Sequence, residues 1–179
     1  MVVVLHLRLW LEYIKITGGT LKTQHKIFKK SSTIPASAEE VFDWHTQPDA
    51  LLKLTPPWIK CRVKPTRDGI HDGNRVLLKI RRGPICINWL AEQRNVEVAR
   101  RFEDIQIYGP FGYWHHVHRF IPIDSSHCIL EDSIEYDMKL KPLLNPLAGL
   151  LVEPDLERLF AFRHAVTIAQ FEKKPSNKF

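Results

Sequence analysis

Hydrophobic and polar side chains alternate along most of the chain between residues 59 and 136, as in β-strands that bury one face. The alternating segments are residues 59–63, 76–80, 85–91, 102–108, 113–120 and 128–136. Short turn sequences such as Asp68-Gly69 and Asp72-Gly73 separate them. Consecutive strands joined by short turns predict an antiparallel meander.

Helical patterns flank this strand region. Residues 23–34 read as a first strand, and Ser37-Ala38-Glu39-Glu40 then forms a capping box that predicts a short helix. A second short helix is expected from Asp49 to Leu54, ended by Pro56-Pro57. After Pro142 the period becomes helical, and Pro154 is acceptable in the first turn of a long helix. The residues at that spacing are Leu156, Leu159, Phe160, Arg163, Val166 and Gln170.

This order of elements predicts an α+β fold in a single domain. A long C-terminal helix must cover the concave face of a curved antiparallel sheet of about six to seven strands, and the gap between them is a natural cavity. We expect residues 1–22 to be an N-terminal extension outside the domain, residues 23–173 to form the ligand-binding domain, and residues 174–179 to be a polar tail.

Composition narrows the class of protein and of partner. The net charge is +6, but the basic residues are dispersed, so no nucleic-acid partner is predicted. Three cysteines without a Cys-x-x-Cys pair fit reduced thiols in the cytoplasm. The apolar run at residues 1–16 is short and interrupted by charged residues, so stable membrane insertion is not expected.

The segment Gly109 to Phe120 is rich in histidine and aromatic residues. Read as a strand, it places Trp114, His116, His118 and Phe120 on one face and His115 on the other. Three interpretations of the inward pair stay open: polar groups lining a cavity, structural hydrogen bonding, or metal ligation.

Two histidines at i, i+2 are a common way to present metal ligands, with Asp104, Asp132 or His164 available as a third. Because no residue is compelled to complete the set, we predict neither a metal nor an organic cofactor. Asp104 or Asp132 beside the imidazoles could instead orient a histidine or take part in acid–base chemistry. Arg163 could bind an anionic group or pair with one of these acids.

Together with these elements, a set of motifs resembles the helix-grip SRPBCC superfamily, which includes START lipid-binding domains and polyketide cyclases. The motifs are Leu54-Thr55-Pro56-Pro57-Trp58, Asp72-Gly73, Gly83-Pro84 with Trp89, Phe102-x-Asp104-x-Gln106, Gly109-Pro110-Phe111, Trp114-x-His116-x-His118-Arg119-Phe120, Asp132 with Tyr136, and Phe160-x-Phe162-Arg163-His164. The resemblance covers about residues 23–172. It is to a bacterial cyclase/dehydrase-like branch that also occurs fused to epimerase-like proteins described as cell-division inhibitors.

The resemblance implies binding of a small hydrophobic or amphipathic molecule, such as a lipid or polyketide, between sheet and C-terminal helix. The expected ligand-binding residues are Trp89, Asp104, Gln106, Trp114, His116, His118, Phe120, Phe160 and Arg163. One alternative is a cyclase or dehydratase, with His116, His118, Asp104 and Asp132 as catalytic candidates. Another is a non-catalytic interaction module, linked to cell division or the envelope, whose protein partner is unknown.

Overall fold

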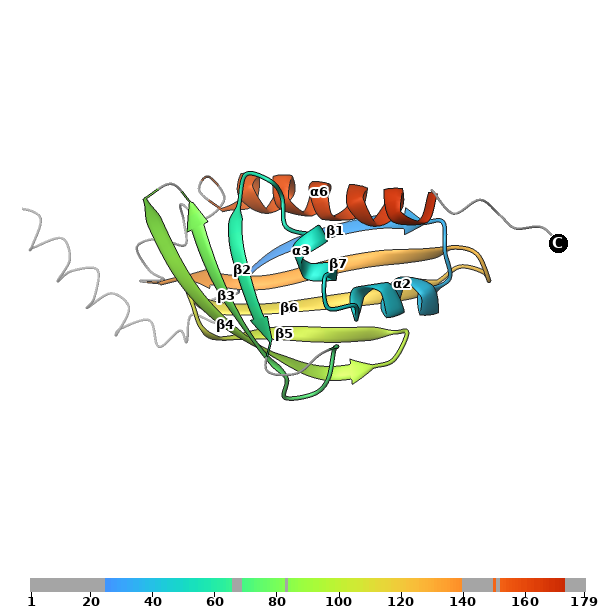
Figure 1. Cartoon of the computed structure of the whole chain (residues 1–179), viewed down its shortest axis with the longest axis horizontal. Helices are drawn as coiled ribbons and strands as arrows, with labels where there is room; N and C mark the ends of the chain where they lie inside the picture. The colour runs from blue at the N-terminus through green and yellow to red at the C-terminus, as the bar shows by residue number, and fades with distance from the viewer. Residues whose placement is uncertain (1–24, 66–68, 83, 140–149, 151, 173–179) are drawn as a thin grey trace, which may run out of the picture.

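The computed structural model describes residues 25–65, 69–82, 84–139, 150 and 152–172, which form one curved sheet with a long helix against it (Figure 1). The strands are β1 (Lys26–Ile34), β2 (Lys60–Pro65), β3 (Arg75–Arg82), β4 (Ile85–Glu97), β5 (Arg101–Tyr108), β6 (Phe111–Pro122) and β7 (Cys128–Met138). The helices are α2 (Ala38–His45), α3 (Ala50–Lys53) and α6 (Glu153–Glu172).

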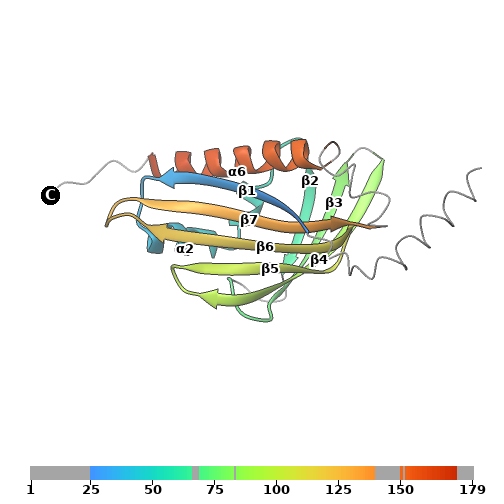
Figure 2. The same cartoon turned by 180° about the vertical axis from the view of Figure 1, so that it is seen from behind.

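All seven strands belong to one antiparallel sheet with the order β1-β7-β6-β5-β4-β3-β2. Strands β2 to β7 form the predicted meander, and β1 joins its far side by pairing with β7. Both views show α6 running along the sheet beside β1, with the β2–β4 arm curving away from β5–β7 (Figures 1 and 2). The predicted α+β helix-grip fold is therefore confirmed.

Two apolar clusters form the core at opposite ends of the long strands. One is built around Phe42, Phe102 and Phe120, and the other around Trp114 and Phe160. Between the two clusters, β6, β7 and α6 each contribute a buried polar side chain, namely His116, Asp132 and His164. The fold thus places polar side chains in the middle of the core.

The predicted capping box is present at the start of α2. The Glu40 backbone N–H donates to Ser37 Oγ at 3.2 Å, and the Ser37 N–H donates to Glu40 Oε2 at 3.2 Å. The second short helix is shorter than expected, and α6 carries Pro154 in its first turn. Because proline is tolerated there, the helix starts close to the predicted position.

The buried face of α6 differs from the predicted stripe. The buried residues are Leu156, Phe160, His164, Thr167 and Phe171. The hydrophobicity pattern placed Arg163, Val166 and Gln170 on that face, because it gave no weight to a buried histidine and threonine. The true stripe contains both polar side chains, since each has a hydrogen-bond partner inside the protein.

The predicted extension at residues 1–22 and tail at residues 174–179 lie outside the described residues. Among the residues that the structure describes, no helix is long and apolar enough to cross a bilayer.

The β5–β6 turn yields a first prediction. A Cβ at Gly109 would overlap the side-chain amide of Gln106, which accepts from the Phe111 N–H at 3.3 Å and donates to the Phe111 carbonyl at 2.9 Å. We expect Gly109→Ala and Gln106→Ala each to lower the free energy of unfolding by about 1–2 kcal/mol, because both remove the same hydrogen bonds. Urea denaturation of the double variant should show a loss close to either single loss; full additivity would contradict this coupling.

Candidate functional site

The polar centre of the core is a carboxylate on β7 that accepts hydrogen bonds from three histidines. Asp132 Oδ1 lies 2.8 Å from His116 Nε2 and 2.8 Å from His118 Nδ1, while Oδ2 lies 2.7 Å from His164 Nε2. Asp132, His116 and His164 are each at most 4% exposed. We call these four residues the Asp132 cluster.

Strand register and helix packing assemble this cluster. On β6 and β7, His118 lies directly opposite Asp132, and on β5 and β6, Asp104 lies opposite His116. Because side chains alternate along a strand, these four strand residues (Asp104, His116, His118 and Asp132) all lie on the concave face. His164 reaches Asp132 from α6, and its Nδ1 lies 2.9 Å from Ser32 Oγ on β1.

The charges in this network follow from which groups face each other. Burial alone would raise the pKa of Asp132, but the charge on His118 and the three histidine hydrogen bonds hold it well below its usual range. Burial would lower the pKa of His118, yet Asp132 and Asp104 on its two sides raise it to about 9. Asp104 Oδ2 lies 3.2 Å from His118 Nε2. His118 is therefore a cation that bridges two carboxylates.

The neighbouring histidine is neutral. Burial and the charge on His118 together lower the pKa of His116 to about 4, despite its hydrogen bond to Asp132. Since the ionised carboxylate can only accept, His116 must donate its Nε2–H to Asp132.

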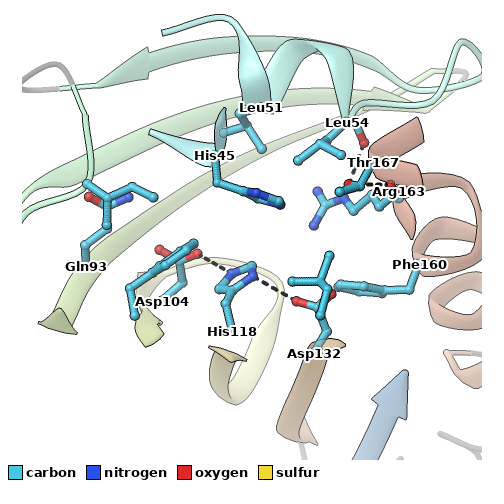
Figure 3. Close-up of a pocket in the computed structure, with 13 residues that line it drawn as sticks. His45, Leu51, Leu54, Gln93, Asp104, His118, Asp132, Phe160, Arg163 and Thr167 are labelled. Atoms are coloured by element: carbon cyan, nitrogen blue, oxygen red, sulfur yellow. Dashed lines mark hydrogen bonds and ion pairs between the residues drawn. The ribbon is translucent and has the colours of Figure 1, made fainter. Parts of the chain in front are cut away.

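A cavity of about 100 Å³ lies above the Asp132 cluster, between the sheet, α3 and α6. Its polar groups come from two sides: His45 and Arg163 extend into it from helices, while Asp104, His118 and Asp132 rise from the sheet (Figure 3). The remaining lining residues are Leu51, Leu54, Ile70, Gln93, Phe102, Leu130, Phe160 and Thr167.

His45 and Arg163 are held by backbone carbonyls. His45 donates its Nδ1–H to the Val41 carbonyl at 2.7 Å, so its Nε2 keeps a lone pair. Burial lowers the pKa of His45 to about 4, which keeps the ring neutral. Arg163 Nε donates to the Leu54 carbonyl at 3.3 Å, and its guanidinium lies 5.1 Å from the centre of the Phe160 ring.

Of the ligand-binding residues expected from the sequence, four line the cavity: Asp104, His118, Phe160 and Arg163. His116 is packed beneath it in the Asp132 cluster. The aromatic residues Trp114 and Phe120 are parts of the two core clusters, and Trp89 packs edge-on against Trp114. Gln106 binds the backbone of the β5–β6 turn.

Two histidines of the site are absent from the expected ligand-binding residues. His45 lines the cavity from the last turn of α2, and its sequence signal is its position one turn after the buried Val41. His164 completes the Asp132 cluster, and its signal is the spacing of four from Phe160. Both spacings indicate a buried residue only if histidine is counted among the side chains that a helix can bury.

A second histidine–carboxylate pair lies on the other face of β5 and β6, away from the Asp132 cluster. His115 Nε2 lies 2.8 Å from Glu103 Oε2, which also accepts from Asn95. His115 lies on the outer face, as the strand alternation predicts, and is half-buried there. This outer pair has the same kinds of side chain as the inner residues, but neither member is among the residues that line the cavity.

Comparisons with known proteins place these features in context. The family model described as "Polyketide cyclase / dehydrase and lipid transport" matches residues 34–162. A search of curated proteins returned no match.

Several solved structures share the fold. Norcoclaurine synthase from Thalictrum flavum, in complex with dopamine and hydroxybenzaldehyde, is 18% identical over 84% of this chain and 89% of that one, with a TM-score of 0.64. Zhui aromatase/cyclase from Streptomyces sp. R1128 is 16% identical over 83% and 94%, with a TM-score of 0.65. A nucleoside-diphosphate sugar epimerase from Corynebacterium glutamicum is 25% identical over 81% of this chain but only 29% of that one, with a TM-score of 0.59.

The Asp132 cluster predicts a large difference between two adjacent acids. Asp132→Asn removes the buried negative charge that faces His118 and replaces one of the two acceptor oxygens by an amide donor, so it should lower the free energy of unfolding by about 3–5 kcal/mol. Glu131→Gln is the matched control, because Glu131 points to the other face and pairs with the partly exposed Arg119; its loss should stay below about 1 kcal/mol. Equal losses in urea denaturation would contradict the central role of Asp132.

His45 predicts a pH dependence of stability. With a folded-state pKa of about 4 against 6.5 when unfolded, the folded protein resists a proton that the unfolded chain accepts as the pH falls below 6.5. The contribution is present above pH 6.5 and is lost toward pH 4, for a total of about 3 kcal/mol. His118 and His164 reinforce the shift, whereas Asp132 opposes it.

His45→Gln should therefore flatten the fall in unfolding free energy between pH 6.5 and 4, measured by urea denaturation at each pH. The exposed His71 provides the control variant His71→Gln, which should keep the wild-type slope. If the two variants have the same slope, the burial of His45 is not responsible.

Proposed function

The chain belongs to the polyketide cyclase/dehydrase and lipid transport family, and hence to the SRPBCC superfamily predicted from its sequence. From that premise we propose that its cavity binds a small, mainly apolar molecule with one polar or anionic end. The observation that carries the proposal is the division of the cavity lining into an apolar wall and a charged floor.

The apolar part of the cavity lining determines which kind of apolar group the ligand can carry. Leu51 and Leu54 line the cavity together with Phe102 and Phe160, so an aromatic or branched apolar group would exchange water for carbon contacts. A volume of about 100 Å³ is below the range of about 300–1,000 Å³ that holds drug-sized molecules. The enclosed part of the ligand is accordingly small, and a longer one would extend through the open side.

The charged residues of the cavity determine which polar group the ligand can carry. His118 is positively charged between its two carboxylates, and Arg163 has donors beyond the Nε that binds Leu54. Guanidinium groups bind carboxylates in a bidentate manner and can donate to the single oxygen of an enolate. A ligand with a carboxylate, an enolate or a carbonyl oxygen therefore fits better than a hydrocarbon.

Proteins of similar fold bind molecules of this kind. The norcoclaurine synthase structure contains dopamine and hydroxybenzaldehyde, which are small aromatic molecules with polar groups. The open cavity with a charged floor also counts against the interaction-module alternative, in which the cavity would be vestigial.

A second candidate is catalysis of the cyclase or dehydratase type. One observation favours it: the neutral His45, with a free Nε2 lone pair, lines the same small space as the Asp104 carboxylate. Two proton acceptors are not needed for binding an apolar molecule, but they suit removal of a proton next to a carbonyl group. In this case the same cavity would orient the substrate.

The binding proposal can be tested by filling the cavity. Leu54 lines it and is 8% exposed, whereas Leu52 on the same short helix is 51% exposed and is not among the lining residues. With benzoate as the probe, isothermal titration should detect binding to the wild type. We expect Leu54→Trp to weaken the affinity at least tenfold, while Leu52→Trp leaves it unchanged.

Arg163→Met tests the polar end separately, because it removes the charge and keeps most of the apolar stem. Benzoate affinity should fall about tenfold or more, whereas benzyl alcohol should be affected less. Native mass spectrometry of the purified full chain would reveal retained molecules directly. If Leu54→Trp and Leu52→Trp bind benzoate equally, the cavity is not the binding site.

A further inference from the structure

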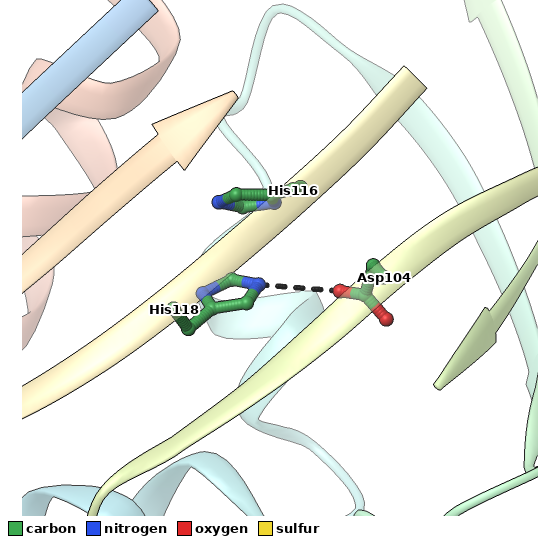
Figure 4. A group of neighbouring side chains, drawn as sticks. All are labelled: Asp104, His116 and His118. Carbon is green, nitrogen blue, oxygen red and sulfur yellow. Dashed lines mark hydrogen bonds and ion pairs between the residues drawn. The ribbon is translucent and has the colours of Figure 1, made fainter. Parts of the chain in front are cut away.

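Three side chains next to the cavity present metal-ligating atoms to one another. One nitrogen each of His116 and His118 and one carboxylate oxygen of Asp104 all lie within 4.8 Å of one another (Figure 4). We propose that these residues form a site for a divalent transition-metal ion of the zinc type. The sequence pattern alone could not select Asp104 over the other possible third ligands.

The backbone fixes this arrangement. Asp104 and His116 are direct partners in the β5–β6 ladder, and His118 follows His116 on the same face. Ligands on two adjacent central strands are positioned more accurately than ligands on loops. The present spacing, within 4.8 Å, is close to the roughly 3.4 Å that separates the ligand atoms of a tetrahedral zinc site.

Asp132 supplies the feature that separates a metal site from a chance cluster. Metal-bound histidines almost always donate their second ring N–H to a carboxylate or carbonyl, which fixes the tautomer and the ring. Here Asp132 Oδ1 takes the N–H of both His116 and His118. The nitrogens that remain are Nδ1 of His116 and Nε2 of His118, and the second already contacts Asp104 at 3.2 Å.

That contact shows where the ion would sit. The His118 Nε2–H donates to Asp104, so a proton now lies between two of the proposed ligands. A metal ion would replace that proton and bind both atoms, leaving His118 neutral as a ligand must be. The ladder, the Asp132 hydrogen bonds and the position of the cavity would stay as they are.

Three protein ligands leave a coordination position open, as in catalytic rather than structural zinc sites. Asp104 and His118 both line the cavity, so the open position faces it. This part of the inference rests on the proposed function: the polar end of the ligand would complete the coordination, and the ion would act as a Lewis acid on a carbonyl oxygen. With Arg163 alongside, the loaded site has one net positive charge, which favours an anionic ligand.

The site can be tested with the metal alone. Chelator-treated, untagged full-length protein is titrated with Zn²⁺ by calorimetry, and with Co²⁺ while its visible absorption is recorded. We expect one equivalent of each ion and the intense bands of low-coordinate cobalt with nitrogen and oxygen ligands. His118→Gln and Asp104→Asn should each weaken binding by at least tenfold and abolish those bands.

The outer pair provides the matched controls. His115→Gln and Glu103→Gln remove the same groups from the other face of the same strands and should leave the affinity and the cobalt spectrum unchanged. Folding of every variant is checked by circular dichroism. The cobalt spectrum of the wild type tests the site even if a variant fails to fold. Absence of stoichiometric binding to the wild type, or equal losses in inner and outer variants, would overturn the proposal.

Failure of the metal site and failure of the binding function give different results. Wild-type protein that binds benzoate with the same affinity after chelation, and takes up no cobalt, has a ligand cavity without a metal. Protein that binds cobalt but no benzoate keeps the metal site and loses the proposed ligand class.

Discussion

The structure depends on one buried carboxylate. Asp132 lies between the two apolar clusters of the core, where an uncompensated charge would be prohibitive. Three histidines from two elements make that charge tolerable, and Asp104 and Ser32 hold two of those histidines in turn. A polar network of this kind specifies one arrangement of β1, β5, β6, β7 and α6, because any other register would leave buried groups without partners.

The curvature of the sheet explains why the network borders a cavity and not a filled interior. Bulges in the β4–β5 pairing, between Leu90 and Ala91 and between Arg94 and Glu97, interrupt the ladder where the sheet bends. The β2–β4 arm then curves away from β6 and β7, as Figure 1 shows. Space remains above His118, and α6 closes it on one side with Phe160 and Arg163.

The sequence predicts the strands well because alternation has a period of two and is read locally. It also predicts the start of α2, since the capping box lies within four residues. It assigns Trp114, His116, His118 and Phe120 to one face correctly, but not their depth: the two aromatic residues are core, both histidines are in the Asp132 cluster, and only His118 also reaches the cavity. Depth depends on sheet curvature and on which helix crosses above, and neither leaves a local pattern. For the same reason strand periodicity gave no sign that His45 lines the cavity, and it did not place His164, named only as a possible metal ligand, at the centre of the core.

The position of β1 has a consequence for how the protein is made. Ser32 on this first strand contacts His164, which is 132 residues later in the chain and on the last helix. During synthesis the strands emerge before α6. Asp132, His116 and His118 therefore lie on an uncovered sheet until His164 is added with α6. Contacts of such sequence separation form slowly and expose unpaired surface in the meantime. The Asp132 cluster is therefore among the last parts of the molecule to form, and a chain truncated before α6 would have the sheet sequence but no finished site.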